Sequence, residues 1–332
     1  MGVGGKSERQ KVARCHVRSD VIHLAIPAAG ETYRFYAEVT AASARLGSSL
    51  PIEVHYIDEN DFRRVMETTG SRQVFTAYHG STITWSRLFL SEMFPDLDWV
   101  VSCDADILFR GDIADLWNLR DAAYWAQPSR DCPFPGLPYN ETSVRWLAEK
   151  GLVLEAPEEY FCAGLTIFNL KAMREGGWGG MRDDFLERYG ISGLHDADQC
   201  VLNYLLRNRK KLLPRGWGVF SGDENADIDW SKSCAVHYVE DTPWKRWKVT
   251  HLVSDLMEIW WDMARTVRKQ YPKEKGYGYL GCRNRLDWLW RRAAFVFLEH
   301  NQWLLRLNHR VWLHFRSTRG VTMRTTCQSK CP

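Results

Sequence analysis

Asp98-Trp-Val-Val-Ser-Cys-Asp104-Ala-Asp106-Ile-Leu-Phe109 places two carboxylates between two apolar runs. Short apolar runs of this kind are typical of strands that are buried on both faces of a sheet. Buried carboxylates need a partner or a metal ion, and residues i and i+2 of an extended backbone project from the same face. We therefore expect Asp104 and Asp106 to share one hard cation, Mg²⁺ or Mn²⁺. Phosphate oxygens would complete the coordination shell of this cation. The alternative is a strand-end turn with solvated acids.

The composition is typical of a soluble globular protein. Hydrophobic residues make up 45% and charged residues 26% of the 332 residues, enough for one large or two modest domains. The formal net charge is only +3, so the charge balance does not indicate a polyanionic partner, and we expect no nucleic acid to bind.

The cysteines and the hydropathy pattern indicate in which cellular compartment we expect the protein. The nine cysteines include no C-x-x-C pair, which excludes the usual zinc-finger and zinc-ribbon spacings. Scattered free cysteines favour the reducing cytoplasm. No apolar run approaches the roughly 18 residues of a membrane-spanning helix, and the basic N-terminus has no apolar signal core.

Strand-like and helix-like segments alternate along most of the chain. This alternation predicts an α/β fold with parallel strands. We expect residues 1–19 to form a flexible basic tail and Gly176–Gly180 to form a flexible joint. The expected strands lie at 21–26, 52–57, 99–109, 163–170 and 235–238, and the expected helices at 32–46, 83–94, 198–206 and through Phe185 and Tyr189.

The C-terminal segment has a different composition. Between Arg283 and Arg319, eight arginines face only two acids, and seven tryptophans and phenylalanines are interleaved with them. Arginines and aromatic residues at helical spacing are typical of an amphipathic segment that lies on a membrane surface. The alternatives are a surface helix that packs on the core and a nucleic-acid-binding segment. We favour membrane docking and therefore expect peripheral association with the cytoplasmic face.

Five motifs occur in an order that resembles family-8 glycosyltransferases, retaining enzymes with a GT-A fold that use a nucleotide sugar. The resemblance covers about residues 20–250 and implies a Rossmann-like mixed central sheet. We expect a transferase domain over residues 20–262 and, from the composition of the C-terminal segment, a helical, membrane-docking region over 263–332. The motifs are Trp85-Ser-Arg87-Leu, Cys103-Asp-Ala-Asp106, Phe161-Cys-Ala-Gly-Leu-Thr-Ile-Phe-Asn169, Asp198-Gln199-Cys-Val-Leu-Asn203 and His237-Tyr238 followed by Pro243-Trp244.

The resemblance implies a metal site and a donor site. Asp104, Asp106 and His237 would hold Mn²⁺, with Mg²⁺ as the second choice because manganese tolerates an imidazole ligand better. The cation would stabilise the negative charge that grows on the leaving nucleoside diphosphate of UDP-glucose or UDP-galactose. The implied donor-binding residues are Ala25, Ile26, Thr32, Tyr33, Arg87, Asp104, Ala105, Gly164 and Lys245. Arg87 alone would be interpreted as a surface arginine.

Asp198 and Gln199 are the candidates for the reacting centre. No second carboxylate is obvious beside Asp198, so the double-displacement chemistry that a carboxylate pair supports is not indicated. The resemblance instead implies a front-face reaction, in which Gln199 supports the oxocarbenium-like state and Asp198 binds sugar hydroxyls. The alternative for Asp198 is that it caps the following helix.

The sequence departs from the family pattern at three places. Pro27-Ala28 stands where many members have an acid, and Cys162 stands where many have an asparagine. The segment from His237 to Trp244 lacks a glycine and a lysine, which Lys245 or Arg246 could replace.

The acceptor side and the protein class leave alternatives. His79 is either an acceptor-side residue or a loop residue, and Gln127–Tyr139 is the expected acceptor-facing loop. We expect a saccharide or a lipid-linked glycan, such as lipopolysaccharide core, as the acceptor. The competing classes are a haloacid-dehalogenase-like phosphatase, with Asp183-Asp184 as its later acidic pair, and a non-catalytic membrane-associated protein of the same fold.

Overall fold

A computed structural model describes residues 21–77, 81–131, 140–220, 233–239, 259–260 and 262–267. The expected basic tail at 1–19 and the arginine-rich segment at 283–319 lie outside these residues. Within the described part, no helix is both long enough and apolar enough to cross a membrane.

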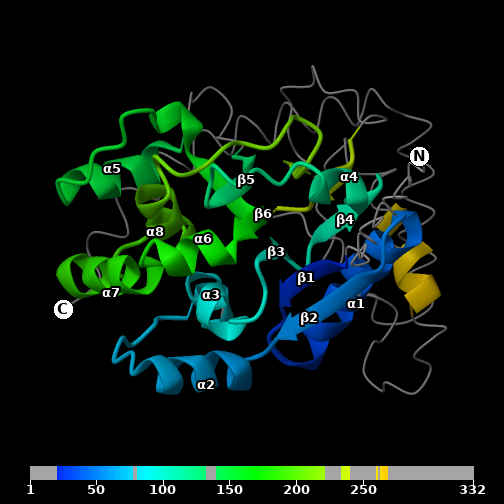
Figure 1. The fold of residues 1–332 in the computed structure, drawn as a ribbon, viewed down its shortest axis with the longest axis horizontal. Coiled ribbons are helices and arrows are strands. Elements are labelled where there is room, and N and C mark those ends of the chain that lie inside the picture. Colours follow the sequence, from blue (N-terminus) through cyan, green and yellow to red (C-terminus); the bar gives the residue numbers. More distant parts are fainter. Residues whose placement is uncertain are drawn as a thin grey trace, which may run out of the picture.

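Five strands form the main sheet in the order β2-β1-β3-β6-β5 (Figure 1). Strand β1 is parallel to both β2 and β3, whereas β6 is antiparallel to both β3 and β5. The expected α/β fold with a mixed central sheet is therefore confirmed. The strands are β1 (Ile22–Pro27), β2 (Ile52–Ile57), β3 (Trp99–Cys103), β5 (Ala126–Arg130) and β6 (Phe161–Asn169).

A second, smaller sheet has the order β4-β8-β7. Strand β4 (Ile107–Phe109) pairs antiparallel with β8 (Ala235–His237), which pairs parallel with β7 (Val219–Phe220). The chain therefore passes from the main sheet to the second sheet within Asp104-Ala105-Asp106, immediately after β3.

Helices cover both faces of the main sheet, as the buried strands require. Successive side chains of β3 enter opposite cores. Val100 packs in the cluster that holds Phe62 of α2 (Glu59–Thr69), and Val101 packs in the cluster that holds Ala41 of α1 (Gly30–Gly47). Helices α5 to α8 lie together at one end of the molecule, away from α1 and β4 (Figure 1). The helices are α1 (Gly30–Gly47), α2 (Glu59–Thr69), α3 (Leu90–Met93), α4 (Ile113–Trp117), α5 (Glu141–Glu149), α6 (Leu170–Glu175), α7 (Trp178–Tyr189) and α8 (Asp198–Leu205).

Two expected elements differ in the structure. The helix expected at 83–94 is a 3₁₀ helix, η1 (Ile83–Phe89), followed by the single turn of α3. Six of the seven η1 residues are buried, so packing on all sides, rather than one apolar face, determines the backbone. A second 3₁₀ turn, η2 (Pro157–Glu159), precedes β6.

The joint expected at Gly176–Gly180 is wrong in part. Gly176 ends α6 and Gly177 has a φ of 75°, but the remaining residues form the first turn of α7. A Cβ atom on Gly176 would overlap the indole ring of Trp125. Close packing and one left-handed backbone position therefore explain these glycines better than flexibility does.

Candidate active site

Asp104 and Asp106 lie in the turn that links β3 to β4. The backbone N–H of Asp104 donates to the carbonyl of Gly164 on β6 (2.8 Å), and that of Ile107 donates to the carbonyl of Asp104 (3.2 Å). The strand expected through both acids is therefore wrong, since the extended backbone stops at Cys103. A turn, rather than the two-residue repeat of a strand, brings both carboxylates to the carboxyl end of β3.

The second sheet brings His237 to this turn. In the antiparallel ladder between β4 and β8, His237 is the partner of Ile107, the residue after Asp106. Its Nε2 atom lies 3.5 Å from Oδ2 of Asp104 and 3.1 Å from Oδ1 of Asp106. One ligand atom from each side chain lies within 4.8 Å of the others, so the three predicted metal ligands are brought together.

The residues at this site fit a divalent cation. Oδ1 of Asp106 is buried and accepts no hydrogen bond from the described part of the chain, although Nε2 of His237 is near. Two carboxylates and one imidazole suit Mn²⁺, and suit Mg²⁺ less well. Gly164 lies against the cluster, and a Cβ atom there would overlap Cε1 of His237 and come within 2.8 Å of Oδ2 of Asp104. Only glycine leaves this space free.

Opposed influences determine the pKa of His237. Burial lowers it, but the carboxylate of Asp106 and the thiol of Cys162 raise it more strongly, so that the pKa is raised to about 10. Sγ of Cys162 lies 3.6 Å from Nδ1, the other ring nitrogen. A cation that binds Nε2 therefore has to displace a proton.

Arg87 links the cluster of candidate metal ligands to the candidate reacting centre at Asp198. Its guanidinium forms an ion pair with Asp104 and another with Asp198, where Nη1 donates to Oδ2 at 3.0 Å. The side chain of Arg87 is only 4% exposed, so its interpretation as a surface arginine is wrong. The capping role for Asp198 is also wrong, because Ala197 holds the N-cap position.

Two further features orient the start of α8. Ala197 has a φ of 45°, a conformation that disfavours any residue except glycine, and it directly precedes Asp198. Burial raises the pKa of Asp198, while the charge of Arg87 opposes this rise. Oε1 of the half-buried Gln199 accepts a hydrogen bond from the backbone N–H of Ala163 at 2.9 Å, which ties the side chain to β6.

The expected donor residues of β1 and α1 lie near the carboxyl end of β1 and on the first turn of α1. Ala25 and Ile26 are fully buried within β1. The ladder between β1 and β3 ends at Ala25, whereas Ile26 pairs with β2. Thr32 and Tyr33 are exposed on the first turn of α1. Ala105 is buried between the two acids.

Several expected residues lie outside the described part of the chain. Lys245 and Arg246 do so, and the cation that would replace the missing lysine therefore stays a prediction. His79 and residues 132–139 of the expected acceptor-facing loop lie outside it as well.

Sequence reasoning missed a second carboxylate near Asp198. Asp196 accepts hydrogen bonds from Asn140 (2.8 Å) and Tyr160 (3.2 Å), and another from Ser143. Burial alone would raise the pKa of Asp196, but the hydrogen bonds from His195 and Ser143 lower it below its ordinary value. The signal was present, because Asp196-Ala-Asp198 repeats the spacing of the first acidic pair.

Comparison with solved structures places the fold among the glycosyltransferases. The galactosyltransferase LgtC, solved with donor and acceptor sugar analogues, matches with a TM-score of 0.57 and 21% identity over 74% of this chain and 96% of that one. The bifunctional glycosyltransferase WbbM matches with a TM-score of 0.56 and 19% identity over 78% of this chain and 53% of that one. The glycosyltransferase GlyE of Streptococcus pneumoniae matches with a TM-score of 0.53 and 17% identity over 75% of this chain and 62% of that one. At these identities the likeness shows a common fold, that of GT-A glycosyltransferases.

The sequence itself defines the family. The chain belongs to Glycosyl transferase family 8, whose model matches residues 34–248. The resemblance inferred from the motif order is therefore confirmed, and the protein is a glycosyltransferase of this family. The match includes both acids and His237 but begins after Tyr33. A search of curated proteins finds no significant match.

Proposed function

We propose that the protein is a retaining hexosyltransferase that moves glucose or galactose from a UDP-sugar to a saccharide or a lipid-linked glycan, with Mn²⁺ as cofactor. The convergence of Asp104, Asp106 and His237 carries this proposal. Their ligand atoms lie at the carboxyl end of β3, where open α/β sheets bind nucleotides. A bound divalent cation would neutralise charge on the diphosphate as the sugar leaves.

Arg87 organises the site between the cation and the sugar. It holds Asp104 on one side and Asp198 on the other, so the two carboxylates keep a fixed separation. The same positive charge favours the binding of a diphosphate beside Asp104. Arg87 is thus a positioning residue for both carboxylates as well as a donor-facing cation.

Asp198 and Gln199 form the reacting centre in this proposal. The carboxylate of Asp198 is buried and held by Arg87, and in this role its oxygens accept hydrogen bonds from sugar hydroxyls. The N–H of Ala163 holds Gln199 by donating to its Oε1, and the second lone pair of this oxygen would stabilise the oxocarbenium-like state. The leaving diphosphate takes the proton of the acceptor hydroxyl in a front-face reaction.

The competing phosphatase has little support. Its proposed acidic pair lies on α7, where Asp183 pairs with Arg182 and Asp184 pairs with Arg188, each at 2.8 Å. Neither side chain belongs to the cluster of Asp104 and its neighbours. A lipid-linked acceptor and docking of the C-terminal segment to a membrane surface remain part of the proposal, and both rest on the sequence alone.

The decisive experiment measures UDP release from UDP-glucose and UDP-galactose. We expect release with Mn²⁺, none with a chelator, and weaker release with Mg²⁺. Phosphate release from a phosphomonoester instead would support the phosphatase, and silence with every donor would support the non-catalytic class. Product anomers resolved by NMR test retention, and sedimentation with anionic vesicles, with and without residues 283–332, tests docking.

A further inference from the structure

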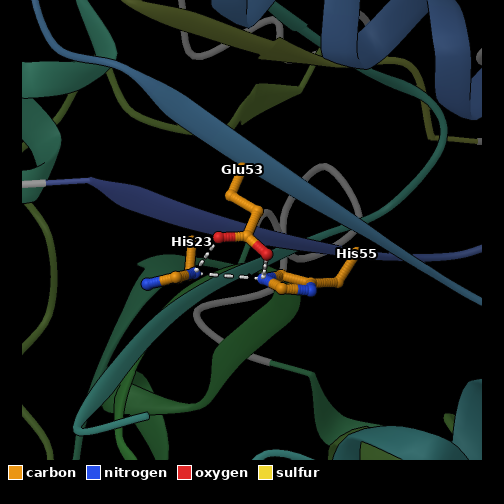
Figure 2. Close-up of side chains that lie close together, drawn as sticks. All are labelled: His23, Glu53 and His55. Carbon is orange, nitrogen blue, oxygen red and sulfur yellow. Dashed lines mark hydrogen bonds and ion pairs between the residues drawn. The ribbon is translucent and has the colours of Figure 1, made fainter.

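A second group of metal-type ligands lies on β1 and β2, away from the candidate active site. Nδ1 of His23 is 3.1 Å from Nε2 of His55. The two oxygens of Glu53 lie 3.6 Å from the first of these nitrogens and 4.0 Å from the second. Figure 2 shows the carboxylate and the two ring nitrogens closing a triangle. The three ligand atoms all lie within 4.8 Å of one another.

The parallel ladder places these three side chains together. His23 is the partner of Glu53, and His55 follows two residues later on the same face of β2. The phenyl ring of Phe94 packs on the His55 ring, with centroids 4.9 Å apart. Both imidazole side chains are 20% exposed, so they are held by the sheet yet remain open to solvent on one side.

The distances fit one tetrahedral ion. With zinc–ligand bonds of about 2.0–2.1 Å, neighbouring donor atoms of a tetrahedral shell lie about 3.3 Å apart. The two ring nitrogens are 3.1 Å apart, close to this value. Oε2 of Glu53 lies 3.6 Å from His23 and Oε1 lies 4.0 Å from His55, so a rotation of the carboxylate would bring one oxygen into the shell. Two imidazoles and one carboxylate are also the ligands that zinc accepts with a fourth position left for water.

We propose that His23, Glu53 and His55 form a zinc-binding site that is independent of the catalytic metal site. The two sites use different strands: this one lies on the β1–β2 ladder, whereas the acids of the first site follow the last residue of β3. The nitrogen-rich donor set favours Zn²⁺ over Mn²⁺, which prefers oxygen ligands. A bound ion would tie β2, the edge strand, to β1.

The competing interpretation is that the two imidazoles share one hydrogen bond and that Glu53 balances their charge. It explains the 3.1 Å contact between the ring nitrogens but predicts no specific uptake of a metal. Co²⁺ distinguishes the zinc site from the hydrogen-bonded pair, because its visible absorption reports a tetrahedral shell and its near-ultraviolet bands report cysteine ligands.

The experiment titrates Co²⁺ and then Zn²⁺ into the full chain carrying Asp106→Asn, which weakens the first site. We expect one ion per chain with a tetrahedral spectrum free of cysteine bands. His23→Gln, His55→Gln and Glu53→Gln should each reduce the affinity by more than the roughly 10–100-fold typical of losing an outer-shell partner. His195→Gln, an exposed histidine, is the matched control and should bind as the parent does.

Equal uptake by all three variants, or a spectrum with cysteine bands, would overturn the zinc site. Circular dichroism checks that each variant is folded. If a substitution prevents folding, zinc-edge X-ray absorption of the Asp106→Asn chain still decides the question, because this site requires two imidazole ligands. The result does not depend on glycosyl transfer, so the zinc site and the proposed function can fail separately.

Discussion

The two clusters of metal-type ligands differ in chemistry and in construction. The first has two carboxylates and one imidazole, is adjoined by Arg87, and combines a turn of the main sheet with a strand of the second sheet. The second has two imidazoles and one carboxylate on two neighbouring strands of a single sheet. The first cluster therefore depends on how two sheets pack, and the second depends only on one ladder.

In the proposed roles, this difference separates a site that does chemistry from a site that holds strands together. Hard oxygen ligands leave a cation able to share phosphate oxygens with a substrate, and the adjoining arginine adds a second positive charge. Nitrogen ligands on one rigid ladder hold a borderline cation more permanently. Substitutions in the first cluster should therefore affect turnover, and substitutions in the second should affect stability and zinc uptake.

The largest effect is expected for Asp106→Ala. Removing this ligand should lower Mn²⁺-dependent UDP release by at least about 10³-fold, because the cation stabilises the charge that develops on the diphosphate. Steady-state UDP release at saturating Mn²⁺ measures the loss. Asp183→Ala, an acid of α7 outside the cluster, should retain normal turnover; equal losses in both would contradict the metal site.

Arg87→Met should be the most destabilising substitution. It leaves Asp198 buried without its cation, which typically lowers the free energy of unfolding by about 3 kcal/mol or more. Urea unfolding measures the loss. Adding Asp198→Asn should recover part of it, because the second change removes the unpaired carboxylate. A loss no larger than that of the exposed Arg63→Met would show that the buried pair contributes little.

Gly164→Ala tests the space around the first cluster. The added methyl would overlap Cε1 of His237 and crowd Oδ2 of Asp104, so we expect the apparent affinity for Mn²⁺ to fall about 10–100-fold. Gly180→Ala is the control, since nothing lies within 4 Å of its added Cβ atom. Activity measured against Mn²⁺ concentration gives the apparent affinity of each variant. Equal affinities of Gly164→Ala and Gly180→Ala would contradict the steric argument.

The smallest effect is expected in thermal unfolding. Zn²⁺ should raise the melting temperature of the parent chain by about 2–4 °C, and His23→Gln should abolish this rise. The rise produced by Mn²⁺ should persist in His23→Gln and disappear in Asp106→Ala. If either substitution abolished both shifts, the two clusters would not be independent.

The sequence supported the first cluster but not the second. Asp104 and Asp106 follow an apolar run, so their position at the end of a central strand could be predicted, and the motif order added His237. His23 and His55 stand far apart in the sequence, and only the register of a parallel ladder brings them together. Register depends on the packing of both faces, which no local pattern reveals.

Local patterns also failed where packing overrides them. The η1 segment has helix-like apolar spacing, yet burial on all sides makes it a 3₁₀ helix that aims Arg87 inward. The ion pair between Arg87 and Asp198 joins residues on different elements, so neither motif indicated the other. Asp104 and Asp106 lie on the same side because they occupy a turn. The sequence predicted this shared side correctly but attributed it to a continuous strand.

The backbone at Ala197 sets a limit on engineering this enzyme. A glycine there would relax the unfavourable φ of 45° and could make the chain more resistant to heat. The same relaxation would free the first turn of α8 from the orientation that directs Asp198 toward Arg87. Heat resistance gained at this position would thus be exchanged for turnover, and a search for hardier variants should leave it alone.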